Sequence, residues 1–155
     1  MANPTLPDLP KRPENSLGRK LTFASGACLA MCQKLLEPHA LTLAQWVLLS
    51  ALWQRDGLLV SQLAAYSGNA APATSRIVDR MEEKGLLRRA REAEDRRVVR
   101  VFLTDEGRAL SRLDRFHETV NDALLDGFTA AEAAMLHTLL ERVEFNARRR
   151  LEDAT

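Results

Sequence analysis

The 155-residue sequence contains few of the residues that build disulfide or metal sites, with only two cysteines and three histidines. The histidines, at positions 39, 117 and 137, have no partner at a metal-ligand spacing, so we expect no metal site and no cofactor. No apolar run approaches the roughly 20 residues that span a bilayer, and the N-terminus lacks the apolar core of a secretion signal. We therefore expect no membrane partner and a cytoplasmic location. The sequence also contains no phosphate-binding glycine loop and no nucleophile–base pair, which argues against an enzyme.

The two cysteines, Cys28 and Cys32, lie four residues apart within a predicted helix and so share one of its faces. Helix geometry places their Cα atoms near the long end of the disulfide range, and cytosolic thiols are normally reduced. Ordinary apolar packing is one interpretation, and a redox- or metal-sensing role is the other.

The apolar fraction of 46%, the charged fraction of 28% and the net charge of +1 are typical of a globular protein. Four prolines among the first 13 residues predict a flexible arm over residues 1–15. Residues 16–155 are long enough to bury the core of a single domain.

The middle of the chain has the element order of a winged helix-turn-helix. A short helix over 61–67, with Ser61 as its cap, ends at Gly68, and a second helix over 72–84 stops at Gly85. Strand-like runs at 86–90 and 98–103 flank a charged tip, and Leu58–Val60 is a candidate third strand. In such a fold one helix enters a DNA major groove and the hairpin enters a minor groove. We therefore predict a mainly α fold with a small β-hairpin wing, in which residues 42–104 bind double-stranded DNA.

Amphipathic helices flank this lobe on both sides. One is predicted over 16–37, a second runs from a Thr104 cap to Gly127, and a last one begins at a Thr129 cap with Glu132 completing a capping box. The lobe does not need them, so their apolar faces must be buried elsewhere. We expect residues 16–37 and 104–150 to form a homodimer that binds a palindromic operator.

The predicted recognition helix presents its Thr74, Ile77, Val78 and Met81 face inward, which leaves a polar face for DNA. Arg76 is a candidate for a guanine or phosphate contact, and its alternative is an ion pair with Asp79. Arg80 is a candidate phosphate ligand, with an ion pair to Glu83 as the alternative. The candidate recognition-helix residues are Pro72, Ala73, Ser75, Arg76 and Arg80.

The head of this helix, Ala70–Ala73, has almost no side-chain donors, so specificity is expected to depend on Arg76, the wing and DNA shape. The wing candidates are Asp95, Arg96 and Arg97; an arginine there suits a narrow minor groove, while Asp95 is expected to brace an arginine or the turn. The segment from Thr74 to Arg100 contains nine basic and six acidic residues, which is a modest excess of positive charge.

An ordered set of motifs resembles the MarR (multiple antibiotic resistance regulator) family of winged helix-turn-helix regulators. The motifs are Leu41-Thr with Gln45-Trp-Val-Leu-Leu49, Leu63-Ala64, Thr74-Ser-Arg-Ile-Val-Asp-Arg-Met-Glu-Glu-Lys-Gly-Leu-Leu87, Glu94-Asp-Arg-Arg97 and Val101-Phe-Leu-Thr-Asp-Glu-Gly107. The resemblance covers roughly residues 16–150. It implies an obligate dimer, a recognition helix at about 72–84, a minor-groove wing centred on Asp95 and Arg97, and often a pocket for a small-molecule effector.

The sequence departs from the family pattern in two places. The recognition helix lacks the usual polar head, and the peroxide-sensing branch places its reactive cysteine where this chain has about Gly18. That sensing chemistry is therefore not expected here. The prediction is a dimeric transcriptional repressor released by a small-molecule ligand; the alternative is a winged-helix protein-interaction module without DNA readout.

Overall fold

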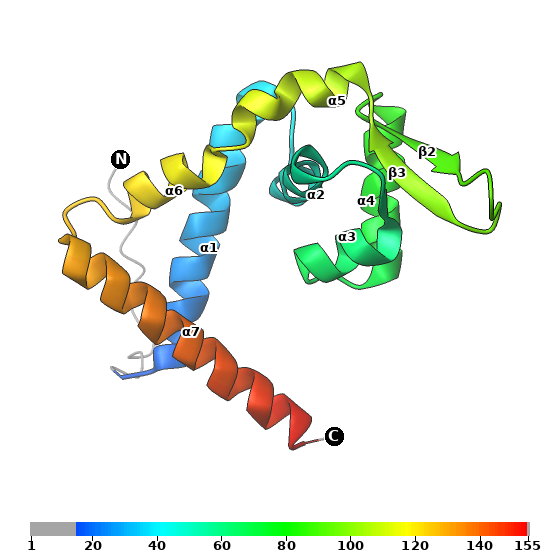
Figure 1. Ribbon diagram of the computed structural model, residues 1–155. Coiled ribbons are helices and arrows are strands. Elements are labelled where there is room, and N and C mark those ends of the chain that lie inside the picture. Colours follow the sequence, from blue (N-terminus) through cyan, green and yellow to red (C-terminus); the bar gives the residue numbers. More distant parts are fainter. Residues whose placement is uncertain (1–14, 155) are drawn as a thin grey trace, which may run out of the picture.

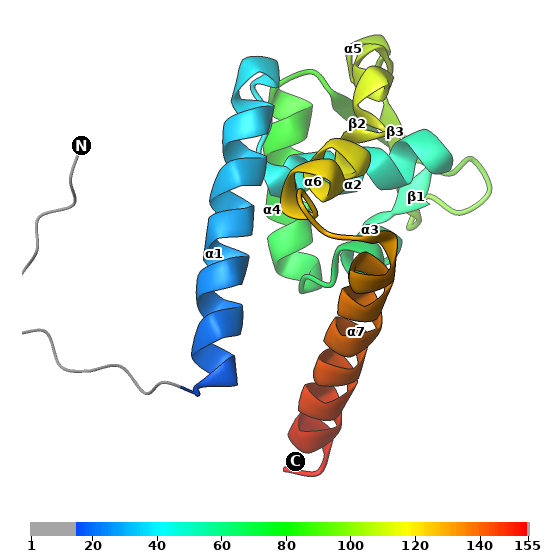
Figure 2. The same ribbon diagram turned by 90° about the vertical axis from the view of Figure 1, so that its left-hand side faces the viewer.

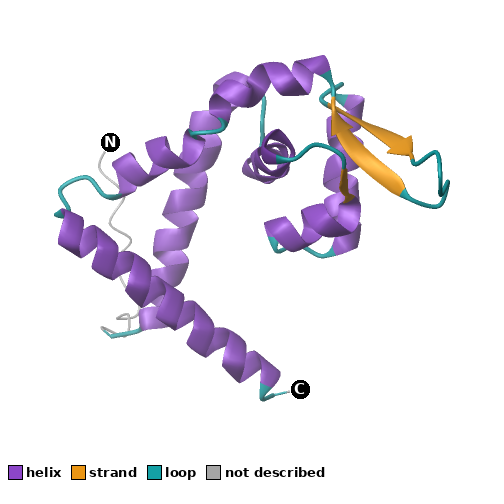
Figure 3. Ribbon diagram, viewed as in Figure 1, coloured by secondary structure: helices purple, strands orange, loops and turns teal. Residues whose placement is uncertain are grey.

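The computed structural model describes residues 15–154, so the predicted arm lies outside the described residues except for Asn15. Helices dominate, and a small sheet lies at one end (Figures 1 and 3). The elements in chain order are α1 (Leu17–Leu36), the 3-10 helix η1 (Glu37–His39), α2 (Leu43–Gln54), β1 (Leu58–Leu59), α3 (Val60–Ser67), α4 (Ala71–Glu83), β2 (Leu87–Arg91), β3 (Val99–Leu103), α5 (Asp105–Ala109), the 3-10 helix η2 (Leu110–Leu113), α6 (Phe116–Leu124) and α7 (Ala130–Glu152). This order confirms the predicted mainly α fold with a winged helix-turn-helix.

Threonine side chains begin three of the helices, as the sequence predicts. The hydroxyls of Thr42, Thr104 and Thr129 each accept a hydrogen bond from the backbone N–H three residues later. The prediction that Ser61 caps the next helix is wrong: α3 begins one residue earlier, at Val60. The backbone N–H of Leu59 instead donates to the side-chain oxygen of Gln62 at 2.9 Å, which brings Ser61 inside the first turn.

The sheet has the strand order β1-β3-β2, and both pairings are antiparallel. The hairpin pairs Leu87 with Leu103 at its base and Arg91 with Val99 near its tip. Leu58 of β1 pairs with Val101, which confirms a third strand; it covers only Leu58–Leu59, because Val60 of the predicted stretch begins α3.

The core lies around α2, which contacts α1, α3, α4 and β3 and is seen end-on between α1 and α4 in Figure 1. On α4 the predicted inward face is confirmed, since Thr74, Val78 and Met81 are buried and Ile77 is half-buried. Cys32 is buried in the same core and Cys28 packs against it. Burial, then the neighbouring Cys28, raises the pKa of the Cys32 thiol. A raised pKa keeps the thiol protonated, which favours the packing interpretation over a reactive cysteine.

The predicted single helix from Thr104 to Gly127 is wrong, because the chain breaks into α5, η2 and α6. The indole N–H of Trp46 donates to the carbonyl of Leu113 at 2.8 Å. The turn that follows brings Phe116 into the core, where its ring lies 5.1 Å from that of Trp46. The helical hydrogen bonds lost at the break are therefore offset by the contact between the buried Phe116 ring and Trp46.

Helix α7 stands apart from the rest of the chain (Figure 2), and none of its 23 residues is buried. Its exposed large apolar side chains are Met135, Leu139, Leu140, Phe145 and Leu151. Within the described residues no single helix is long and apolar enough to cross a bilayer; α1 with η1 and α2 reach that length and composition only as a pair bent by 71°.

Candidate nucleic-acid interface

Helix α4 and the β2–β3 wing lie beside each other at the end of the molecule away from α6 and α7 (Figure 1). Helix α3 packs against α4, and the turn between them passes through Gly68 in the left-handed conformation, at φ 69°. This arrangement leaves one face of α4 open next to the hairpin.

The head of α4 begins without a side-chain cap. Ala70 is the N-cap residue and offers no hydrogen bond from its side chain. Pro72 occupies the first turn, where its missing N–H costs nothing, and it is exposed together with Ala73. The uncapped backbone N–H groups of this turn are therefore available to an anion such as a phosphate.

Two arginines project from the open face of α4. Arg76 and Arg80 are both exposed, and among the described residues neither forms an ion pair. The alternative pairing of Arg76 with Asp79 is therefore wrong, because Asp79 binds Arg89 instead. The alternative pairing of Arg80 with Glu83 is not formed either, so both guanidinium groups remain available.

Arg89 of β2 is a residue that the sequence did not single out. Its Nη1 lies 2.6 Å from Asp79 and 2.7 Å from Glu82, and its backbone N–H donates to Glu82 at 2.8 Å. Its Nη2 donates to the Ser75 hydroxyl at 3.3 Å, which leaves the hydroxyl hydrogen of Ser75 free to donate elsewhere. Arg89 thus joins the wing to the recognition helix, through contacts that no i,i+4 pattern reveals.

The wing tip is organised by Asp95, as predicted. Its carboxylate accepts the backbone N–H of Arg97 at 2.9 Å, and its backbone carbonyl accepts the N–H of Val98 at 2.9 Å. The Arg97 side chain is 95% exposed and Arg96 is also exposed, so the tip presents two arginines to solvent.

Further contacts hold the wing against the body. Arg100 pairs with Glu92 across the hairpin and donates to the carbonyl of Gly57 at 3.0 Å. The ring of Phe102 lies against Gly57, where a Cβ atom would approach to 2.8 Å. Gly57 also has φ +73°, so both its backbone conformation and its neighbour require glycine.

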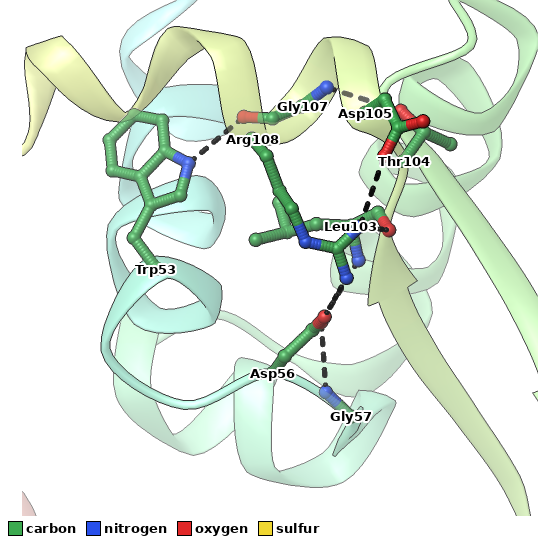
Figure 4. A network of polar contacts seen from close by, with 8 residues as sticks. All are labelled: Trp53, Asp56, Gly57, Leu103, Thr104, Asp105, Gly107 and Arg108. Carbon is green, nitrogen blue, oxygen red and sulfur yellow. Dashed lines mark hydrogen bonds and ion pairs between the residues drawn. The ribbon is translucent and has the colours of Figure 1, made fainter.

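Asp56 stands at the base of the wing, where α2 ends (Figure 4). Its Oδ1 accepts hydrogen bonds from the N–H groups of Gly57 at 3.0 Å and Leu103 at 2.9 Å. Its Oδ2 accepts from Nη2 of Arg108 at 2.8 Å. Nearby, the indole N–H of Trp53 donates to the carbonyl of Gly107 at 3.0 Å.

A hollow of about 300 Å³ opens beside this network. It is lined by Leu52, Trp53, Asp56, Leu103, Arg108 and Ser111. A second hollow, of about 230 Å³, lies between the end of α1 and the η2–α6 segment, and includes His39 and Arg115. Among the described residues no group of three or more His, Cys, Asp or Glu side chains is placed to hold a metal ion.

The chain is similar to known transcriptional regulators in sequence and in structure. The model of the MarR family matches residues 41–99. The chain is 37% identical over 123 residues to the HTH-type transcriptional regulator TtmR of Methylorubrum extorquens (strain PA1), a match that covers 75% of this chain and 60% of TtmR. The chain thus spans about 60% of the length of that curated relative.

Solved structures of similar proteins cover most of the chain. A MarR mutant from E. coli in complex with operator DNA is 26% identical with a TM-score of 0.75, covering 83% of this chain and 94% of that one. BpsR of Bordetella bronchiseptica, whose DNA binding is regulated by 6-hydroxynicotinic acid, is 25% identical with a TM-score of 0.73, covering 84% of this chain and 99% of that one.

Proposed function

Because the chain belongs to the MarR family, we propose that it is a transcriptional regulator that binds double-stranded DNA in a sequence-specific manner. The observation that carries this proposal is the pair of exposed arginines on α4, Arg76 and Arg80, beside a wing that presents Arg96 and Arg97. The structure of the E. coli MarR mutant with operator DNA supports it, as a similar fold that binds DNA.

In this proposal α4 enters the major groove and the wing follows the adjacent minor groove. Arg76 contacts a guanine edge or a phosphate, and Arg80 and Ser75 contact phosphates. Pro72 and Ala73 bring the uncapped start of α4 against the backbone, and Arg96 and Arg97 enter the minor groove. Asp95 contributes by holding the turn that carries Arg97.

We propose that the protein acts as a homodimer on a palindromic operator. The apolar side chains that α7 exposes are supplemented by Leu17, Phe23 and Leu29 on α1 and by Leu124 and Phe128 around the end of α6. Exposed apolar surface on this scale is unusual in a monomer. A second copy of the same helices would cover it and place two reading heads about one helical turn of DNA apart.

We further propose that it is a repressor that a small-molecule ligand releases. A ligand can release it only by binding more tightly to a conformation that does not fit the operator. The regulation of BpsR by 6-hydroxynicotinic acid supports a ligand of low molecular weight. The hollow lined by Trp53, Leu103 and Arg108 offers space between the DNA-binding part and the segment that leads into α6. The second hollow offers space among the flanking helices themselves.

The test is a binding titration at several salt concentrations with the DNA upstream of the coding sequence, using a scrambled duplex of equal length as control. Selective binding with a steep salt slope is expected, and light scattering of the free protein should give the mass of a dimer. Binding no tighter than to the scramble, together with failure in a genome-wide DNA selection, would favour a winged-helix protein-interaction module instead.

A further inference from the structure

We infer that Asp56 is a positioning residue for the wing, and that its ion pair with Arg108 couples the wing to the segment leading into α6 and α7. The inference rests on the proposed function, because it assigns a means by which the flanking helices adjust DNA binding. None of the residues involved belongs to the predicted DNA-contacting set.

Both backbone polar groups of Leu103 are held by this pair. Its N–H donates to Oδ1 of Asp56 at 2.9 Å, and its carbonyl accepts from Nη1 of Arg108 at 3.1 Å. Asp56 and Arg108 are joined to each other at 2.8 Å, so the three residues form a closed set of contacts (Figure 4). Leu103 is the last residue of β3 and pairs with Leu87 at the base of the hairpin.

The base of a hairpin determines where its tip lies. Val99 is four residues from Leu103, and each strand residue adds roughly 3.3 Å, so the tip lies more than about 13 Å from the held backbone of Leu103. A small rotation at Leu103 is therefore enlarged at Arg96 and Arg97. Gly57, whose N–H also donates to Asp56, accepts from Arg100 through its carbonyl, so the same carboxylate supports a second contact to β3.

The other side of the pair lies in α5, directly between the wing and the flanking helices. Helix α5 has only five residues and follows β3 after the single residue Thr104. The Trp53 indole holds the carbonyl of Gly107 at 3.0 Å, next to Arg108, so α5 is also fixed to the end of α2. Movement of α5 relative to α2 would therefore change the distance between Arg108 and Asp56.

The pair is open enough to break without unfolding the core. The side chains of Arg108 and Asp56 are 53% and 30% exposed, and ion pairs in such positions contribute little to stability. The hydrogen bonds from Gly57 and Leu103 to Asp56 have neutral donors and remain when Arg108 leaves. The wing would then stay folded but lose one of the contacts that fix its direction.

Hydrogen exchange of the free protein tests the coupling without DNA. Asp56→Asn keeps an oxygen that can accept from Leu103 and Gly57 but loses the charge pair, whereas Asp56→Ala loses every contact. We expect faster exchange over residues 99–103 in Asp56→Ala and in Arg108→Gln, and a smaller increase in Asp56→Asn. Arg115→Gln is the matched control, since it removes an exposed ion pair with Glu118 at 2.7 Å that is remote from the wing, and it should leave this exchange unchanged.

A double-mutant cycle with DNA separates positioning from stability. If Asp56 positions the wing, the fold-loss in DNA affinity caused by Arg97→Ala should be about three times smaller, or smaller still, in the Asp56→Ala background than in the wild type. If thermal denaturation shows that Asp56→Ala is not folded, Arg108→Gln replaces it in the cycle. Unchanged exchange in Arg108→Gln, or an Arg97→Ala cost independent of the background, would overturn the inference. If the wild type binds no DNA but the variants show the expected differences in hydrogen exchange, the proposed function is overturned and the inference about Asp56 is not.

Discussion

Nη1 of Arg89 in the wing lies 2.6 Å from Oδ1 of Asp79 in α4, so the two elements proposed to touch DNA are bonded directly to each other. Burial disfavours the charged form of Arg89, but the hydrogen bonds that it donates to Asp79 and Glu82 outweigh this effect and raise the pKa of the guanidinium above its ordinary value. The angle between the wing and α4 is thus fixed on the β2 side by Arg89. On the β3 side, Asp56 holds the base of the hairpin through the backbone N–H of Leu103.

Replacing Arg89 by methionine should destabilise the protein. The change removes the guanidinium contacts to Asp79 and Glu82 and leaves Glu82 with only the backbone N–H of residue 89, with an expected loss of about 1–3 kcal/mol in the free energy of unfolding. Urea denaturation measures it. Arg80→Met is the control, because exposed Arg80 has no ion pair among the described residues and should change stability by less than about 0.5 kcal/mol. Equal losses in the two variants would contradict a bracing role for Arg89.

Replacing Gly107 by alanine should be among the most damaging small substitutions in the chain. A Cβ atom there would lie 2.2 Å from the backbone carbonyl oxygen of Leu86, which cannot move aside as a flexible side chain would. We expect a loss of at least about 2 kcal/mol, as for overpacking in a buried position. Gly26→Ala in α1 is the matched control: no atom of the described residues of one protomer lies within 4 Å of the added methyl group, and the change should be neutral or stabilise by up to about 1 kcal/mol. The comparison is made by thermal or urea denaturation, and a Gly107 variant as stable as the Gly26 variant would contradict it.

Local sequence signals predicted the elements well because they act within one turn of chain. The Thr42, Thr104 and Thr129 caps each depend on a residue three positions later. The inward face of α4 likewise follows from its 3.6-residue period. Only Ser61 failed among the predicted caps, because the Leu59–Gln62 contact competed with it.

The contacts that orient the site could not be predicted in the same way. Asp56 meets Leu103 and Arg108 across 47 and 52 residues, and Arg89 meets Ser75 across 14. Helical spacing suggested Arg76 as the partner of Asp79, but the folded hairpin brings a better-placed arginine to that carboxylate. The break after Leu113 similarly depends on Trp46, 67 residues earlier. Such pairings exist only once the tertiary fold has formed.

Replacing Arg76 by alanine should weaken DNA binding. Its guanidinium is exposed on the open face of α4, so a bidentate contact to guanine would make the loss about 1–3 kcal/mol and would relax selectivity at one base pair. Titrations against the operator and against single-base variants distinguish this from a phosphate contact, which would weaken binding to all sequences equally. No loss on any sequence would remove Arg76 from the interface.

Replacing Arg97 by alanine should reduce affinity and the salt dependence of binding, with less effect on the dimer. The side chain is 95% exposed at the wing tip, and the change leaves the Asp95 carboxylate with its bond to the backbone N–H of residue 97. Loss of one phosphate contact lowers the slope of log affinity against log salt by about one, so a homodimer that loses one contact in each protomer should lose about two. Binding is measured by fluorescence anisotropy and dimerisation by sedimentation. An unchanged affinity would exclude the wing tip from DNA binding.

The start of α7 should respond to acid through Glu132. Hydrogen bonds to its carboxylate from the backbone and then the side chain of Thr129 lower its pKa below the ordinary value of 4.5. A lowered folded-state pKa means that the capping contribution is present above about pH 4.5 and is lost as the pH falls through the folded value. Glu132→Gln keeps a side-chain acceptor for the capping box but cannot titrate. The wild type should therefore be the more stable of the two at pH 7, and this advantage should shrink as the pH falls toward 3 in paired urea denaturations. If the two proteins lose stability in parallel over that range, the acid response of α7 does not come from Glu132.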